Sequence, residues 1–260
     1  SKMIMELIEL SNPNFQEETI FIFPEGALTG INLNDIKIYK KLFQDNYSSK
    51  HKIILGINSY ENSKIFNSLV VLDNNANILL KYNKNNLVPF GEFLPFESLL
   101  SKLGIKKITI GYQSYSADKV RKILNINNIK FLPLICYEII YSGRLNKDNN
   151  DYNFIINISE DGWFGNSIGP YQHFSHSIFR AIEEGKNLIR SANNGVTAHI
   201  DPTGYVVNKI ESTQKGVIEV NKFKNNKKTF FGTHGNNLFF YFILIYITLI
   251  FFLKKKQKGS

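Results

Sequence analysis

The sequence predicts an α/β domain followed by one hydrophobic helix at the C-terminus. Buried-type strands, hairpins and amphipathic helices alternate along residues 1–235, which is typical of a layered α/β fold. Residues 238–253 then run without a charge and end at a cluster of lysines. The 260 residues, 43% of them hydrophobic, are enough for one domain with a sizeable core.

The chain opens on a helix and a short strand. In residues 3–8 the apolar side chains follow the i, i+1, i+4, i+5 spacing of a helix's buried stripe. The β-rich run 20–23 is stopped by Pro24, and Glu25 comes directly after it. A carboxylate at the carboxyl end of a buried strand lies where α/β proteins place ligands. With no initiator methionine and no signal peptide, we expect a fragment whose beginning lies elsewhere.

A helix, three strands and a loop are predicted next. Residues 35–47 have the pattern of an amphipathic helix. Residues 52–60 are a strand, and residues 66–84 are a hairpin around an Asp-Asn-Asn turn. Residues 86–100 hold two prolines and a glycine and predict an ordered loop that leads into a short helix. The turn-rich residues 104–119 are expected to form a covering segment.

The second half of the sequence again predicts hairpins and buried strands. Residues 122–138 predict a hairpin followed by a buried strand. Residues 151–165 predict another buried strand that ends in polar residues. Residues 171–195 predict a helix leading into a short strand, and residues 197–207 a last hairpin with a Pro-Thr-Gly turn.

The charge of the chain does not indicate a nucleic-acid partner. The net charge is +9, but the lysines are scattered among asparagines and isoleucines through most of the chain. Gly-rich phosphate loops are absent from the sequence, so nucleotide use is not indicated either. His173 and His176 stand three apart on the predicted helix, but no further ligand with recognisable spacing completes a metal site.

The C-terminal hydrophobic segment is interpreted as a single membrane anchor. As a helix, residues 238–253 span roughly 24 Å, somewhat less than the ~30 Å hydrocarbon core. Apolar residues occupy every face, aromatic residues stand at both ends, and lysines follow at 254–258. We expect a membrane helix at 236–253, a basic cytoplasmic tail at 254–260, and residues 1–235 on the outer face of the membrane. The alternative is a buried core helix.

Cys136, the only cysteine, raises the question of chemistry. One cysteine cannot form a disulfide within the chain, so no disulfide framework holds the domain. A lone cysteine is commonly a buried, inert side chain. The alternative is a nucleophile, which requires a base and a group that stabilises negative charge.

Glu25 and Lys84, at other strand or turn ends, would supply those two functions. Glu25 would take the proton of the thiol as its sulfur attacks a carbonyl. The ammonium of Lys84 and the backbone N–H of Tyr137 would stabilise the oxyanion, each such donor contributing about 2.7 to 4 kcal/mol. The chemistry would be acyl transfer through a thioester. Spacing alone leaves both interpretations of Cys136 open, because such residues occur far apart in most proteins.

Five segments together resemble a known family. They are FPEGAL (23–28), YNKNNLVPFGEFLP (82–95), LICYEI (134–139), DGWFGNSIGPYQHF (161–174) and IRSANNGVTAHID (189–201). Their order and spacing are similar to those of the carbon-nitrogen hydrolase (nitrilase) superfamily, and within it to the branch that acylates bacterial lipoproteins. The likeness covers about residues 3–253.

The resemblance implies a nitrilase-like αββα sandwich and a set of site residues. Glu25 would be the general base, Lys84 the oxyanion-stabilising lysine and Cys136 the nucleophile. Glu92 matches the second essential glutamate of the family, and Tyr137 and Glu138 match residues that support the nucleophile. The alternatives are a turn-capping carboxylate for Glu92, a core aromatic for Tyr137 and a salt-bridged strand end for Glu138.

The resemblance also implies substrates and a location. A phospholipid would donate an acyl chain to the cysteine, and the amino group of a lipoprotein's diacylglyceryl-cysteine would accept it. No cofactor would be needed. The protein would lie in the bacterial inner membrane, with the catalytic domain on the periplasmic side. Apolar residues in segments 86–100 and 161–170 would contact lipid or line an acyl channel, or alternatively pack as ordinary loops. Two other functions stay open: hydrolysis of a small amide, and an inactive remnant. Members begin with membrane helices and a first strand that this sequence lacks.

Overall fold

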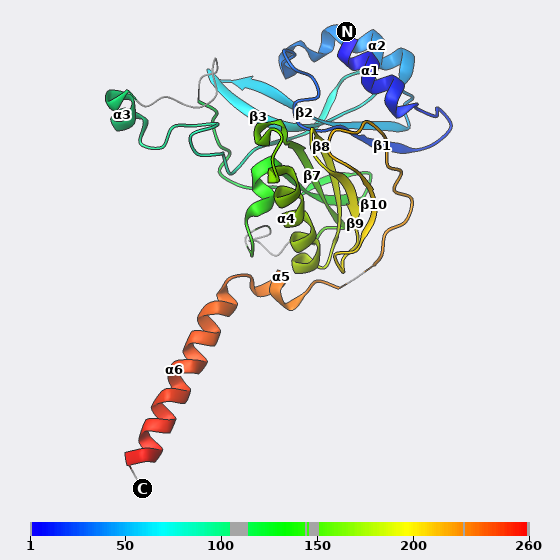
Figure 1. Cartoon of the computed structure of the whole chain (residues 1–260). Helices are drawn as coiled ribbons and strands as arrows, with labels where there is room; N and C mark the ends of the chain where they lie inside the picture. The colour runs from blue at the N-terminus through cyan, green and yellow to red at the C-terminus, as the bar shows by residue number, and fades with distance from the viewer. Residues whose placement is uncertain (1, 105–113, 144, 146–150, 226, 259–260) are drawn as a thin grey trace.

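Two β-sheets packed face to face form the body of the chain, with helices on their outer faces (Figure 1). The computed structural model describes residues 2–104, 114–143, 145, 151–225 and 227–258. The arrangement is the α-β-β-α order of layers that the sequence predicts, so the predicted fold class is confirmed. Most of the predicted covering segment, residues 105–113, lies outside the described residues.

The first sheet has four strands in the order β1-β2-β3-β4. Strand β1 is parallel to β2, and the other neighbours are antiparallel. The bounds are β1 Thr19–Ile22, β2 His51–Glu61, β3 Lys64–Leu72 and β4 Ile78–Asn83. The hairpin of β3 and β4 confirms the prediction made from its Asp-Asn-Asn turn.

Helices α1 and α2 cover the outer face of this sheet. Helix α1 spans Lys2–Ser11, and Ile4 and Ile8 are its buried residues. The helix predicted at 35–47 is divided into a 3₁₀-helix, η1 (Leu33–Tyr39), and helix α2 (Lys40–Asn46). Short 3₁₀ segments are common where an α-helix begins, so the amphipathic face is kept although the first turns are tighter.

The second sheet has six strands in the order β10-β9-β8-β7-β6-β5. The central strands β6, β7 and β8 are parallel, and helix α4 (Gly169–Glu184) connects β7 to β8. The bounds are β5 Leu124–Ile126, β6 Ile129–Ile135, β7 Phe154–Glu160, β8 Asn187–Asn193, β9 Thr197–Ile200 and β10 Val206–Ile210. These elements confirm the strand, helix and hairpin predictions of the second half.

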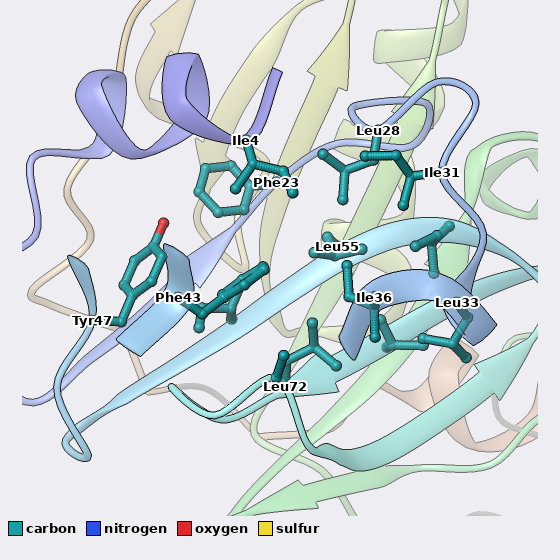
Figure 2. Close-up of a cluster of buried hydrophobic side chains, with 14 of the residues drawn as sticks. Ile4, Phe23, Leu28, Ile31, Leu33, Ile36, Phe43, Tyr47, Leu55 and Leu72 are labelled. Atoms are coloured by element: carbon teal, nitrogen blue, oxygen red, sulfur yellow. The ribbon is translucent and has the colours of Figure 1, made fainter. Parts of the chain in front are cut away.

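Side-chain alternation along the strands produces three hydrophobic layers. In β2, Ile53 and Leu55 point towards α1 and α2, whereas Ile54 points between the two sheets. Figure 2 shows the outer layer, where Leu55 and Phe23 pack with side chains from the covering helices. The third layer lies between the second sheet and α4. The alternation follows from the period of two in a β-strand.

Helix α6 (Asn237–Lys258) leaves the body as a single long helix (Figure 1). Its residues 237–255 are apolar enough to cross a membrane, and no part of that window is buried against the rest of the described chain. The alternative of a buried core helix is therefore wrong. Helix α5 (Phe230–His234) precedes α6, and the Asn236 side chain donates to the Ser142 carbonyl at 3.0 Å.

Candidate active site

The three residues predicted for acyl transfer each follow the end of a strand. Glu25 comes after β1 and Lys84 directly after β4, both in the first sheet, and Cys136 directly after β6 in the second. Because the sheets pack face to face, these strand ends meet. Glu25 and Lys84 are close enough to Cys136 that both alter the pKa of its thiol.

Two carboxylates and one lysine form the centre of the site. The Lys84 Nζ donates to Glu92 Oε1 at 2.9 Å and lies 3.9 Å from Glu25 Oε1. The amide of Asn67, on β3, donates to both carboxylates, at 2.5 Å to Glu25 and 2.9 Å to Glu92. The other oxygen of Glu25 accepts the backbone N–H of Glu160 at 2.8 Å. These contacts hold the two carboxylates, the lysine and the Asn67 amide in one arrangement.

Burial sets the charges in this cluster. Burial raises the pKa of Glu25, and the nearby Lys84 ammonium opposes that rise only in part. Burial by itself would lower the pKa of Lys84, but the carboxylates of Glu25 and Glu92 raise it above its ordinary value. Lys84 therefore stays protonated, while Glu25 is a better proton acceptor than an exposed glutamate.

The thiol of Cys136 is buried and protonated. The pKa of this thiol is raised to about 12. Burial is the main cause of the rise, the Glu25 carboxylate adds to it, and the Lys84 ammonium opposes it. Its Sγ lies 3.9 Å from the Glu160 carbonyl oxygen. The residue has a φ of 47°, in the left-handed region that a non-glycine residue rarely adopts. Backbone strain of this kind clusters at functional sites, and surrounding contacts must hold it.

Glu138 is completely buried and joins the backbone on both sides of the site. Its carboxylate accepts from the backbone N–H groups of Asn85 (2.9 Å), Asn86 (3.1 Å) and Ile135 (2.9 Å). It also accepts from the Tyr82 hydroxyl and pairs with Arg121 at 3.2 Å. Glu138 is ion-paired, as the structural interpretation expects, although it lies in a 3₁₀-helix and not at a strand end. Its partners flank Lys84 and Cys136 in the sequence, so its contacts also fit a role in supporting the nucleophile.

Glu92 and Tyr137, the other two predicted supporting residues, make contacts that fit both the functional and the structural interpretation. Glu92 caps a turn, since its Oε2 accepts the Val88 N–H at 2.8 Å, while its Oε1 binds Lys84. Tyr137 is half-buried and packs edge-on against Tyr141, with ring centroids 5.5 Å apart. Glu92 therefore fits both interpretations, and Tyr137 offers its backbone N–H beside the nucleophile.

Sequence reasoning missed several residues of the site. Asn67 lies in the middle of strand β3. The sequence feature that could have identified it is a polar side chain within an otherwise apolar strand. His173, which the sequence reasoning rejected as a metal ligand, is buried next to the nucleophile, with Nε2 3.2 Å from the Cys136 carbonyl oxygen. Asp161 and Arg190 contact His173 from the other side. Within the described ranges, no group of three or more His, Cys, Asp or Glu side chains is arranged to hold a metal.

Two segments that adjoin residues of the site in the sequence expose large apolar side chains. In the first, residues 88–103, Phe96 is 81% exposed and Leu99 and Leu103 are also exposed. In the second, residues 162–171, Trp163 is 66% exposed, and Phe164, Ile168 and Tyr171 are exposed as well. Phe164 is partly packed, with its ring centroid 5.5 Å from that of His173, whereas Phe96, Trp163 and Ile168 are largely exposed.

Comparisons with known proteins find relatives over most of this chain. The sequence model of the carbon-nitrogen hydrolase family matches residues 4–221. A relative from Wigglesworthia glossinidia brevipalpis, named apolipoprotein N-acyltransferase, is 37% identical over 220 residues, which are 80% of this chain and 43% of the relative. A relative of the same name from Rhizobium rhizogenes is 35% identical over 207 residues, 77% of this chain and 39% of the relative.

A solved structure shares the fold. The carbon-nitrogen hydrolase superfamily protein XC1258 of Xanthomonas campestris superposes with a TM-score of 0.57 at 16% identity, over 84% of this chain and 81% of that chain. The present chain spans about two fifths of the length of the two curated relatives.

Proposed function

This chain belongs to the carbon-nitrogen hydrolase family, and on that premise we propose that it transfers an acyl chain from a phospholipid to the N-terminal diacylglyceryl-cysteine of lipoproteins. One observation carries the proposal: the buried thiol of Cys136 and the cluster of Glu25, Lys84 and Glu92 contact the same residue. Glu160 donates its backbone N–H to Glu25 at 2.8 Å, and its carbonyl oxygen lies 3.9 Å from the Cys136 Sγ. The names of the relatives support the choice of substrates.

The first half-reaction would form a thioester. Glu25 takes the proton of the Cys136 thiol while Sγ attacks the ester carbonyl carbon of a phospholipid. The carbonyl oxygen becomes an oxyanion, stabilised by the Lys84 ammonium and the Tyr137 N–H. When the carbonyl re-forms, the ester C–O bond breaks, and Glu25 gives its proton to the leaving oxygen. The products are the acyl-enzyme and a lysophospholipid.

The second half-reaction would form the amide. The α-amino nitrogen of the lipoprotein's cysteine attacks the thioester carbonyl, and Glu25 takes a proton from that nitrogen. The C–S bond then breaks, and the sulfur recovers the proton from Glu25. Glu92 contributes by holding Lys84 beside Glu25 throughout. The acyl-enzyme thus passes its chain to an amine, and Cys136 returns to the thiol.

The apolar surfaces support a membrane location. We propose residues 1–235 as the catalytic domain, 236–253 as a membrane helix and 254–260 as a basic cytoplasmic tail of a bacterial inner-membrane protein, with the catalytic domain in the periplasm. The exposed side chains of residues 88–103 and 162–171 would contact lipid near the site. Since both substrates are embedded in the bilayer, an anchored site would meet them by diffusion in two dimensions.

The proposal is tested by intact mass spectrometry of the detergent-purified chain after incubation with a phospholipid. We expect a mass gain of one fatty acyl chain that hydroxylamine removes and that the Cys136→Ala variant lacks. Addition of a diacylated lipopeptide should discharge the adduct and yield a triacylated peptide. An adduct that persists in Cys136→Ala, or a folded wild-type chain that gains no mass, would disprove the proposal.

Removal of helix α6 is expected to separate membrane binding from chemistry. A chain that ends at Gly235 should bind phospholipid vesicles much more weakly than the full chain, because α6 is unburied and apolar and only the exposed side chains of the loops would remain to contact lipid. Acylation of Cys136 by a water-soluble thioester should be retained in the shortened chain. Vesicle flotation and intact mass measure the two properties, and equal flotation of the shortened and full chains would contradict the assignment of α6 as the anchor.

Gly56 on β2 leaves the space through which the backbone of Glu25 passes. A Cβ at Gly56 would lie 2.7 Å from the Glu25 Cα and 3.0 Å from Ile158 Cδ1. Gly56→Ala must therefore displace Glu25, and we expect acylation of Cys136 to slow by about 10- to 100-fold. Gly216→Ala is the matched control, because its Cβ would meet only the Ile210 side chain. Equal acylation rates in the two variants, measured by intact mass, would contradict this role of Gly56.

A further inference from the structure

The peptide bond between Cys136 and Tyr137 carries the oxyanion donor of the proposed reaction. In a trans peptide the C=O and N–H groups point in opposite directions within one plane. Whatever holds the Cys136 carbonyl therefore also sets the direction of the Tyr137 N–H. Since Cys136 has a left-handed φ of 47°, this plane needs a contact that holds it in place.

His173 supplies that contact. Its Nε2 lies 3.2 Å from the Cys136 carbonyl oxygen, and its side chain is buried on helix α4. A carbonyl oxygen can only accept, so the bond requires a proton on Nε2. Two turns further along α4, Arg180 donates to the Ile140 carbonyl at 3.2 Å, at the other end of the 3₁₀-helix η3 (Cys136–Ile140). Helix α4 therefore holds the nucleophile's helical turn at both ends.

The groups behind His173 favour a proton on Nε2. Its Nδ1 lies 3.1 Å from Arg190 Nη2, a donor, and 2.9 Å from Asp161 Oδ1. Burial lowers the pKa of His173 and Arg190 lowers it further, although the Asp161 contact opposes this, so the imidazole is neutral. Nδ1 can accept from Arg190, which only donates, or donate to Asp161 Oδ1, which only accepts. A neutral ring with its proton on Nε2 satisfies the Cys136 and Arg190 contacts, whereas a proton on Nδ1 would satisfy only the Asp161 contact. Asp161 Oδ1 has another donor, the Ser159 hydroxyl at 2.7 Å, so the proton is assigned to Nε2. Asp161 in turn fixes Arg190, through Oδ2 at 2.6 Å.

We propose that His173 is a positioning residue that holds the Cys136 carbonyl and thereby aims the Tyr137 N–H at the oxyanion of the acyl-transfer reaction. The proposal rests on the proposed function, since the oxyanion forms only in acyl transfer. As negative charge develops on the substrate oxygen, the Tyr137 N–H is polarised, and electron density on the Cys136 carbonyl increases. The bond from His173 Nε2–H then strengthens, as expected of linked hydrogen bonds in a buried site.

Kinetics of matched variants distinguish this role from a merely structural one. His173→Leu removes the donor, and we expect the maximal rate of Cys136 acylation to fall at least about tenfold with an unchanged KM for the acyl donor. His173→Gln keeps an amide N–H near the position of Nε2 and should restore most of the rate. His199→Leu is the control, because His199 is buried on β9 and its ring contacts Asn187 instead.

Alkylation by iodoacetamide provides a second reaction of the same thiol. Displacement of iodide by sulfur forms no oxyanion, so His173→Leu should be alkylated at Cys136 at the wild-type rate. A parallel loss of alkylation and acylation would mean that His173 merely supports the fold, and the proposal would be wrong. Equal acylation rates in His173→Leu and His173→Gln would also overturn it.

A spectroscopic measurement tests the contact without any turnover. Since Cys136 is the only cysteine, labelling with [¹³C-carbonyl]cysteine and [¹⁵N]tyrosine gives one HNCO cross-peak, from the Cys136–Tyr137 peptide. We expect His173→Leu to shift this carbonyl resonance upfield through loss of the hydrogen bond, and His199→Leu to leave it in place. An unmoved peak in His173→Leu would overturn the proposal. If the peak moves but the wild-type chain is not acylated by any donor, the hydrogen bond between His173 and the Cys136 carbonyl is real. The proposed acyl transfer would then be wrong, and with it the role of His173 in that reaction.

Discussion

Glu25→Gln is expected to slow acylation of Cys136 by about 10²- to 10⁴-fold, the usual contribution of a general base. The thiol has a pKa of about 12, so very little thiolate exists at neutral pH and a base must remove the proton during attack. Glutamine keeps the shape of the side chain and can still accept from Asn67, but its amide group has no basic oxygen to offer the thiol. The measurement is the rate of acyl-enzyme formation by intact mass.

The pH dependence of acylation provides an independent signature of Glu25. Burial raises the pKa of Glu25, and the base is active only when ionised. The acylation rate should therefore fall as the pH drops through this raised pKa, at a higher pH than an ordinary glutamate would give. Glu25→Gln should lose this acidic limb, because no titrating base remains. An acidic limb that persists unchanged in the variant would assign it to another group.

Glu18→Gln is the matched control for Glu25→Gln. Glu18 stands just before β1, at the end opposite to Glu25, and its exposed carboxylate accepts only from Asn127 at 3.2 Å among the described hydrogen bonds. The same chemical change there should leave the acylation rate within about twofold, as is usual for surface substitutions. An equal loss in both variants would mean that Glu25 has no special part in the reaction.

The sequence predicted the fold well because buried strands are short runs of apolar residues. Such runs lie within 52–60 and make up 131–135, and they are typical of strands whichever partners they meet. The prediction for 35–47 was less accurate, since the pattern of a 3₁₀-helix and that of an α-helix are similar over two turns. The exposed Phe96 and Trp163 show a further limit, because an apolar side chain in a loop does not reveal whether it packs.

The site was predictable only where a reactive residue stood at a strand end. Glu25, Lys84 and Cys136 have that position, and the structure brings them together. Asn67 and His173 contact partners more than 30 residues away, at Glu25 and Cys136. No local pattern encodes such pairings, although each residue is a polar side chain on the buried face of its strand or helix.

Glu138→Gln is expected to lower the free energy of unfolding by about 3 to 5 kcal/mol, as when one partner of a buried ion pair is removed. The side chain is fully buried, and the variant leaves the buried guanidinium of Arg121 without its counter-charge. The glutamine amide would also turn N–H groups towards the backbone donors of Asn85 or Ile135. A loss of this size is a large part of the stability of a typical domain.

Chemical denaturation of the detergent-solubilised chain measures this effect, with two further variants as references. Glu61→Gln removes a partly exposed carboxylate that pairs with Lys81, and its cost should be at most about 1 kcal/mol. The double variant Glu138→Gln with Arg121→Met removes both buried charges and should recover part of the lost stability, because no unpaired charge remains. A Glu138→Gln chain as stable as Glu61→Gln would show that the buried pair does not hold the two sides of the site together.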